Sequence, residues 1–158
     1  MVYRQRHARV NVFAMHDLVL VLHSWVRWAA IVAGVLATLT AIASSSNLPG
    51  NKRWGLYFTI ALDVQFLLGL LLLLTSSAFG NMGETMKDAT ARFYAVEHPT
   101  IMVVAIALAH MGSVLARKAK TPAAARTKSI IFFSLATLLL IVGTPWPGRL
   151  DSRPLFRL

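Results

Sequence analysis

The chain has no cysteine and very few acidic residues, and both shortages narrow what it can be. Without cysteine it has no disulfide, no thiolate-bound metal and no iron–sulfur cluster. Aspartate and glutamate together number 6 of 158 residues, and charged residues of all kinds make up 14% of the chain. A water-soluble domain carries about 25% charged residues. The scarcity of charge therefore argues against a soluble protein.

Apolar sequence is what the chain has in excess: 56% of its residues are hydrophobic and the mean hydropathy is +0.61. Four long runs hold most of it, at residues 18–43, 54–79, 99–116 and 129–147. A membrane-spanning helix needs about 20 predominantly apolar residues, within a range of about 17–25. The sequence therefore predicts an all-α integral membrane four-helix bundle with up-down-up-down topology. We place it at residues 15–149, after a basic tail at 1–14 and before a C-terminal tail at 150–158.

The net charge of +10 comes from basic residues at the ends of the apolar runs rather than from one patch. That distribution is typical of contact with lipid headgroups, so we expect membrane lipids and no nucleic acid as partners. The basic residues of the segment 117–128 have no acid among them, and we expect it to be a cytoplasmic loop with both termini outside. The first run is too long for a signal peptide and is expected to remain in the protein.

The third run is preceded by a polar segment, residues 81–96, which we expect to form a short helix on the membrane surface. Asn81 and Glu84 have the spacing of a capping box at its start. Pro99 is expected to open the next helix, since proline is tolerated at the first helical position. His98 is then pushed out of the helical region and is expected to cap that helix.

Ionisable residues inside apolar runs are costly, so each is a hypothesis about function. Counting back from the presumed cytoplasmic helix ends at about 1.5 Å per residue puts His23 about 30 Å and His98 about 27 Å above them. The two histidines therefore share a level near the outer face. A haem b between helices needs two imidazoles on facing helices at matched depth, so we predict His23 and His98 as ligands of a haem iron.

Other assignments of the same residues stay open. His98 can instead serve only as a helix cap, and His23 can instead hydrogen-bond to a neighbouring helix. Arg27, one turn deeper than His23, can pair with Glu97 or bind a haem propionate, because guanidinium prefers planar anions. Arg92 is a second candidate for a propionate, and Glu97 belongs to the same predicted cofactor site. His16, one heptad before His23, is a reserve ligand.

A second, inner level holds Asp63 and His110, about 14 and 9 Å above the same helix ends. A carboxylate and one imidazole make a poorer axial pair than two imidazoles, so a second haem is disfavoured. His98 and His110 also differ by about 120° of helix rotation and cannot stack along one face. We interpret Asp63 and His110 as a buried ion pair or hydrogen bond, ahead of a proton relay or a second metal site. His110 is a lower-ranked alternative haem ligand.

Several motifs resemble a family of small bacterial four-helix membrane proteins labelled cytochrome b-like. They are Leu22-His-Ser-Trp-Val-Arg-Trp28, Gln65-Phe-Leu-Leu-Gly69, Arg92-Phe-Tyr-Ala-Val-Glu-His-Pro99, the basic third loop and Pro145-Trp-Pro147. The resemblance implies a haem b bundle of the bacterial inner membrane that carries electrons, as a subunit or partner of a respiratory or photosynthetic complex. Quinone, other redox subunits or further copies of the chain are the implied partners. Many members have a histidine near Asp63, so the aspartate weakens the case for a second haem.

The sequence thus favours an electron carrier over a stand-alone enzyme. Two other classes remain: a haem-free structural subunit of a larger complex, and a small proton-coupled transporter that uses Asp63 and His110. The transporter ranks last because the sequence has no internal repeat and no pair of interrupted helices.

Overall fold

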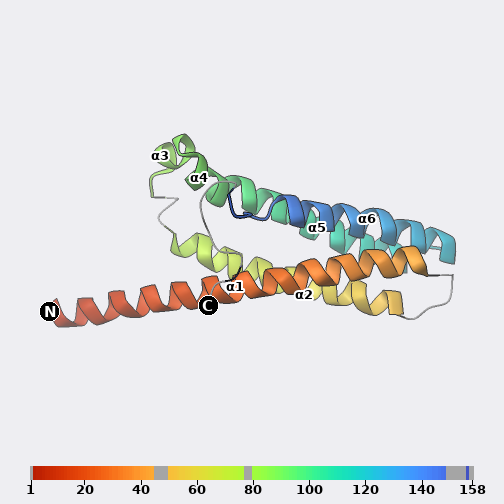
Figure 1. The fold of residues 1–158 in the computed structure, drawn as a ribbon, viewed down its shortest axis with the longest axis horizontal. Coiled ribbons are helices and arrows are strands. Elements are labelled where there is room, and N and C mark those ends of the chain that lie inside the picture. Colours follow the sequence, from red (N-terminus) through yellow and green to blue (C-terminus); the bar gives the residue numbers. More distant parts are fainter. Residues whose placement is uncertain (1, 45–49, 77–79, 149–155, 157–158) are drawn as a thin grey trace.

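The structure is a computed structural model that describes residues 2–44, 50–76, 80–148 and 156, with side chains at 15–44, 53–76, 80–148 and 156. Most of the predicted C-terminal tail, and the side chains of the predicted N-terminal tail, lie outside the described residues. Four long helices and three short helical turns make up the fold (Figure 1). Their bounds are α1 Val2–Ala43, α2 Gly50–Thr75, α3 Met82–Lys87, α4 Ala89–Arg92, the π-helical turn η1 Phe93–Glu97, α5 His98–Arg117 and α6 Pro122–Val142.

The long helices pack as antiparallel neighbours in chain order. α1 lies against α2, α5 lies against α6, and α1 also packs along α6, whereas α2 and α5 have the loosest contact (Figure 1). The bundle is therefore all-α and up-down-up-down, which confirms the predicted fold class. α1 and α6 share one side of the bundle, and α2 and α5 form the opposite side.

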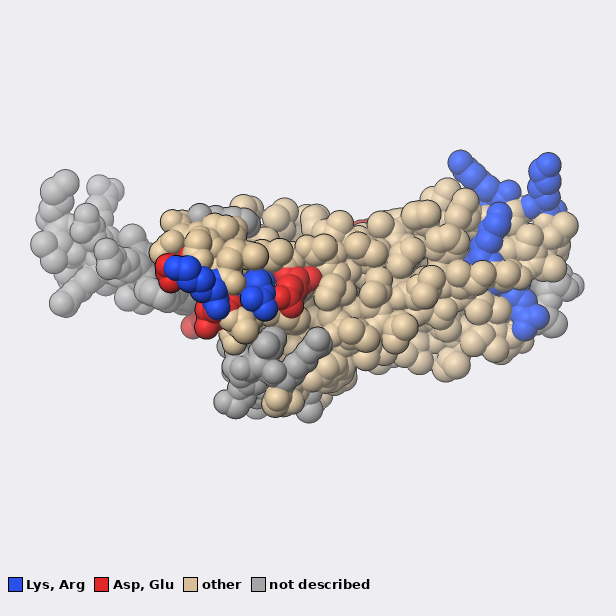
Figure 2. Space-filling model, turned by 90° about the horizontal axis from the view of Figure 1, so that it is seen from above, with Lys and Arg blue, Asp and Glu red and all other residues tan. Residues whose placement is uncertain are grey.

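The outer surface of the bundle is apolar along most of its length. Spans at Met15–Ala43, Arg53–Thr75, Ala89–Arg117 and Pro122–Val142 have the length and composition of membrane helices, yet at most 28% of any of their apolar windows is buried inside the protein. Figure 2 shows a broad belt of uncharged residues between one end with lysine, arginine and acidic residues and an opposite end with lysine and arginine. A surface of this kind needs lipid around it.

Small residues close the helices together at the end of the bundle near α6's start; we call this the packed end. Its core contains Ala30, Ala33, Ala37, Phe58, Ala109, Phe133 and Ala136, and continues to Leu62 and Leu140, which also line the cavity described below. A Cβ at Gly34 would lie 2.6 Å from Thr137 Oγ1 and 2.8 Å from the Phe58 ring. One at Gly112 would lie 2.5 Å from Phe132 Cβ. Glycine at these two positions lets the helices approach within contact distance, as close packing in a membrane requires.

The third span differs from the prediction. Helical structure continues from Ala89 through η1 to Arg117, and His98 has helical dihedral angles of −59° and −51°. The backbone N–H of His98 donates to the carbonyl of Phe93, five residues back, so the turn before Pro99 is wider than an α-helical turn. A proline ring inside a helix crowds the carbonyl four residues earlier, and the wider turn makes room for it. The prediction that His98 caps the helix was therefore wrong.

The polar segment before this span is only in part a separate helix. α3 is a short helix that Asn81 precedes, but the Asn81 side chain makes no capping hydrogen bond there. α4 and η1, which complete the predicted surface segment, instead lead straight into α5. The predicted capping box is therefore not formed, and residues 89–96 belong to the third span.

The basic segment 117–128 is largely helical rather than a loop. α6 begins at Pro122, and the Thr121 side chain caps it by accepting a hydrogen bond from the Ala124 amide. Arg126, in the second turn of α6, donates to the carbonyls of Ala41 at 3.2 Å and Ile42 at 2.6 Å. Those carbonyls are among the last of α1, where a helix runs out of its own amide donors, and the Ser44 hydroxyl also donates to the Ala41 carbonyl at 3.1 Å. The arginine thus ties α6 to the end of α1.

Candidate functional site

A cavity of about 760 Å³ lies between the helices at the other end of the bundle from the packed end. All four long helices line it, together with residues from α3, α4 and η1. Its walls are mainly apolar, with Leu20, Phe66, Leu70, Met102, Val103 and Ile106 among them. Ligand cavities in proteins measure roughly 300–1,000 Å³ and are mostly apolar with a few polar groups. The cavity therefore has the size and character of a site for a bulky ligand.

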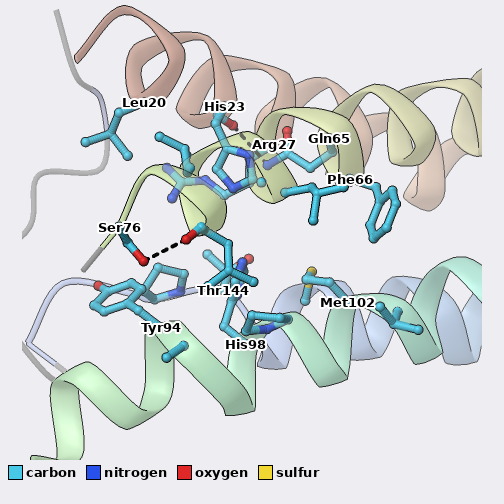
Figure 3. Close-up of a pocket in the computed structure, with 18 of the residues that line it drawn as sticks. Leu20, His23, Arg27, Gln65, Phe66, Ser76, Tyr94, His98, Met102 and Thr144 are labelled. Atoms are coloured by element: carbon cyan, nitrogen blue, oxygen red, sulfur yellow. Dashed lines mark hydrogen bonds between the residues drawn. The ribbon is translucent and has the colours of Figure 1, made fainter. Parts of the chain in front are cut away.

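His23 on α1 and His98 on α5 face each other across this cavity (Figure 3). Their ring centres are 6.3 Å apart and their planes are inclined at 76°. A metal–imidazole bond of about 2.0–2.1 Å on each side would separate two coordinating nitrogens by roughly 4 Å, and the ring radii add about an ångström at each end. The observed spacing therefore fits one metal atom between the two rings.

A backbone carbonyl fixes the protonation of His98. The Nδ1 atom lies 2.8 Å from the carbonyl oxygen of Gly143, just beyond the end of α6. A carbonyl can only accept, so Nδ1 must carry the hydrogen and donate it. The lone pair is then on Nε2, which is the arrangement that a metal-binding histidine uses.

His23 is held by two residues of α2 that lie one turn apart. The Gln65 amide donates to the backbone carbonyl of His23 at 2.9 Å. Gly69 lies under the imidazole, where an added Cβ would be 3.1 Å from His23 Cε1. The Nδ1 atom of His23 is buried and makes no hydrogen bond of standard geometry with the described residues. It lies beside α2, 3.7 Å from where a Cβ on Gly69 would stand.

Arg27 is the cationic member of the cavity wall. It lies one turn from His23, its Nη2 is 3.4 Å from Ser24 Oγ, and its guanidinium is 5.4 Å from the centre of the Trp28 ring. Its alternative partner, Glu97, instead bonds to Arg92 Nε at 2.8 Å. Arg92 also donates to the Met86 carbonyl at 3.4 Å. Neither Arg92 nor Glu97 lines the cavity, so the structure brings only Arg27 of these three to the histidine pair.

Two further histidines with described side chains, His16 and His110, are not part of the facing pair. His16, one heptad before His23, also lines the cavity, and its Nδ1 is 3.7 Å from the carboxylate of Asp17. His110 lies outside the cavity, and its Nε2 is 2.8 Å from Asp63 Oδ1. The hydrogen bond between them agrees with the interpretation from sequence. The prediction that the pair is buried was wrong, because the side chains of His110 and Asp63 are 45% and 49% exposed.

Several residues that position the site were not recognised from sequence as its parts. Gln65 and Gly69 appeared only as part of a motif, and their one-turn spacing was the signal that both lie on one face of α2, the face toward His23. The hydrogen bond from His98 to the Gly143 carbonyl could not be predicted, because a backbone acceptor leaves no trace in the pattern of side chains. In the described part of the chain, no three histidines, cysteines or acids gather to hold a metal ion.

The four apolar spans make this chain a multi-pass membrane protein, a four-helix bundle with a cavity that two histidines face. Comparison with protein-family models, with curated proteins and with solved structures finds no match. The fold agrees with the four-helix architecture that the resemblance implies, and the family itself stays an expectation.

Proposed function

We propose that the cavity binds one haem b, whose iron His23 and His98 would hold, and that the protein carries electrons within the membrane. The observation that carries this proposal is the facing imidazole pair: ring centres 6.3 Å apart, one ring oriented by the Gly143 carbonyl and the other held against α2 by Gln65 and Gly69. Both features favour a metal centre between the rings over a pair of structural histidines.

A haem suits two imidazoles better than a bare metal ion does. Structural zinc takes four protein ligands, whereas a haem iron needs only axial ones from the protein. The apolar walls suit a flat, hydrophobic macrocycle and keep water from it. Arg27 would neutralise a propionate, because its planar guanidinium matches a carboxylate.

When bound, the haem supplies a one-electron couple. The chain's own residues would hold it in one orientation: His98 through the Gly143 bond, and His23 through Gln65 and Gly69. By the positive-inside rule, we infer that the 117–128 end lies in the cytoplasm and that both termini lie outside. The cavity would then lie toward the outer face of a bacterial inner membrane. Electrons would pass to or from a quinone or a redox subunit of a respiratory or photosynthetic complex. This role is that of a carrier rather than a stand-alone enzyme.

The test is a reduced-minus-oxidised spectrum of the purified protein, produced with an ample haem supply. We expect a low-spin b-type signal at one haem per chain. His23→Ala and His98→Ala should each abolish it, since one imidazole cannot hold the iron in this form. His16→Ala and His110→Ala are matched controls, and both should keep the full signal.

A folded but colourless protein would contradict the proposal and favour the haem-free accessory subunit. A haem signal that survives both His23→Ala and His98→Ala would show that these histidines do not hold the iron and would make His16 the next candidate. The transporter alternative has no support from the cavity, since Asp63 and His110 lie outside it.

A further inference from the structure

Asp63 and His110 form a polar pair on the outer surface of the bundle, at the loosely packed seam between α2 and α5. Their 2.8 Å hydrogen bond crosses this seam, and about half of each side chain is exposed. Asp63 lies ten residues from Arg53, and His110 lies seven from Arg117, which is about 15 and 10 Å at 1.5 Å per residue. In a hydrocarbon layer about 30 Å thick, both are well inside the membrane.

The pair leaves two polar atoms without a partner among the described residues, Asp63 Oδ2 and His110 Nδ1. If the shared proton is on His110, Nδ1 of the imidazolium is a donor and Oδ2 of the carboxylate is an acceptor. If it is on Asp63, Nδ1 carries the hydrogen of the neutral ring and Oδ2 is a carbonyl acceptor. Every net-neutral form thus offers one donor and one acceptor side by side. Lipid chains satisfy neither of them.

The surface around the pair is apolar on both helices. Ile60 and Leu67, three and four residues from Asp63, are 49% and 64% exposed. On α5, Val103 and the small Ala107 lie on the same face as His110 and are exposed. A polar pair inside an apolar face, with a small residue beside it, is how membrane helices pack against another protein.

We propose that this face is the interface of a homodimer whose two-fold axis runs along the membrane normal. All copies insert with the same orientation, so rotation about the normal keeps every residue at its depth. The hydrogen bond places Asp63 and His110 at one depth, side by side. A second copy turned by 180° therefore sets its His110 opposite Asp63 and its Asp63 opposite His110. The donor of each copy then meets the acceptor of the other, as a self-complementary two-fold contact requires.

The chain's lack of cysteine makes the test clean. Ala107→Cys places a single thiol on the proposed interface, and Val32→Cys, 53% exposed on α1, places one on the opposite side. Each full-length variant is reconstituted in lipid bilayers at low protein density, oxidised and run on a gel without reductant. We expect the Ala107→Cys protein to form at least ten times more disulfide-linked dimer than the Val32→Cys protein.

Further substitutions test the polar pair itself. Asp63→Leu with His110→Leu in the Ala107→Cys background should reduce cross-linking about tenfold. Exchanging the two side chains, Asp63→His with His110→Asp, should restore it, because the donor and acceptor still face each other across the axis.

Single-molecule photobleaching of a labelled chain gives the second measurement, with two bleaching steps expected. A monomer in this assay overturns the proposal, and so does a dimer that cross-links through Val32→Cys. A monomer would mean that something other than a second copy, such as a lipid or quinone hydroxyl, bonds to the polar pair. The haem spectrum is an independent readout, since the pair lies outside the cavity, so failure of either proposal leaves the other standing.

Discussion

The packed end and the cavity end of the bundle are built from the same four helices, yet only one of them closes. On α1, the packed end presents Ala30, Gly34 and Ala37, whereas the cavity end presents His23 and Arg27. Small residues let helix backbones meet, so dispersion contacts hold most of the packed end, and Arg126 adds hydrogen bonds to the end of α1. Larger and polar residues keep the helices apart at the other end. Close packing and the ligand-sized cavity thus occupy separate lengths of the same helices.

The largest difference between the two ends should come from removing a buried ring. Phe58 is fully buried at the packed end, and Phe58→Ala should lower the free energy of unfolding by about 3–5 kcal/mol through lost contacts and a cavity. Phe66→Ala, on the cavity wall and 40% exposed, is the matched control and should cost less than half as much. Reversible unfolding in mixed detergent measures both, and equal losses would remove the distinction between the ends.

Adding a methyl group should have a smaller effect at the packed end. Gly34→Ala puts a Cβ 2.6 Å from the side-chain oxygen of Thr137, so one of the packed helices must shift. The substitution should lower the free energy of unfolding by about 1–3 kcal/mol. Gly83→Ala, where the added Cβ meets nothing within 4 Å, should leave stability within about 0.5 kcal/mol or raise it slightly. The same unfolding assay compares them. A tolerated Gly34→Ala would show that the packed end can relax.

The smallest effect on stability should be the most informative about the cavity. Gly69→Ala brings a Cβ to 3.1 Å from the His23 ring, which can tilt into the cavity, so the cost should stay below about 1 kcal/mol. If His23 binds the iron, that tilt should shift the midpoint potential and the haem spectrum. A redox titration measures the shift.

Gly55→Ala is the matched control for that variant. Its added Cβ would lie 2.8 Å from Phe133 Cζ, in the packed end, so it should destabilise the protein without moving the potential. A potential that changes equally in both variants would argue against a direct effect on His23.

Apolar run length was enough to predict the four spans and their topology, because membrane thickness allows few other arrangements. The ends of the spans were harder to predict. α6 starts at Pro122 rather than near residue 129, because Thr121 and Pro122 make a good helix start and Arg126 finds acceptors on α1. Such partners come from another helix, and no local pattern reveals them.

The meeting of His23 and His98 followed from counting residues along two helices, since depth depends only on helical rise. Which way a side chain faces depends instead on helix rotation. Asp63 and His110 were placed at one depth correctly but were expected inside the bundle, and they lie on its surface. The pairing of Glu97 with Arg92 rather than Arg27 has the same cause. The depth of a residue in the membrane can be estimated from sequence, whereas the side of the helix on which it meets its neighbours cannot.

The π-helical turn before Pro99 amounts to one extra residue of chain in an otherwise regular helix. A π-helical turn closes from residue i to residue i+5 and an α-helical turn from i to i+4, so the extra residue is taken up within a single turn. Deleting one residue from Phe93–Glu97 would therefore restore an α-helical turn and leave α4 on the same side of the bundle relative to α5. Pro99 would then crowd the carbonyl four residues before it, because the wide turn that makes room for its ring would be gone. The turn thus lets a proline stand inside a continuous membrane span without changing the direction of the helix that precedes it.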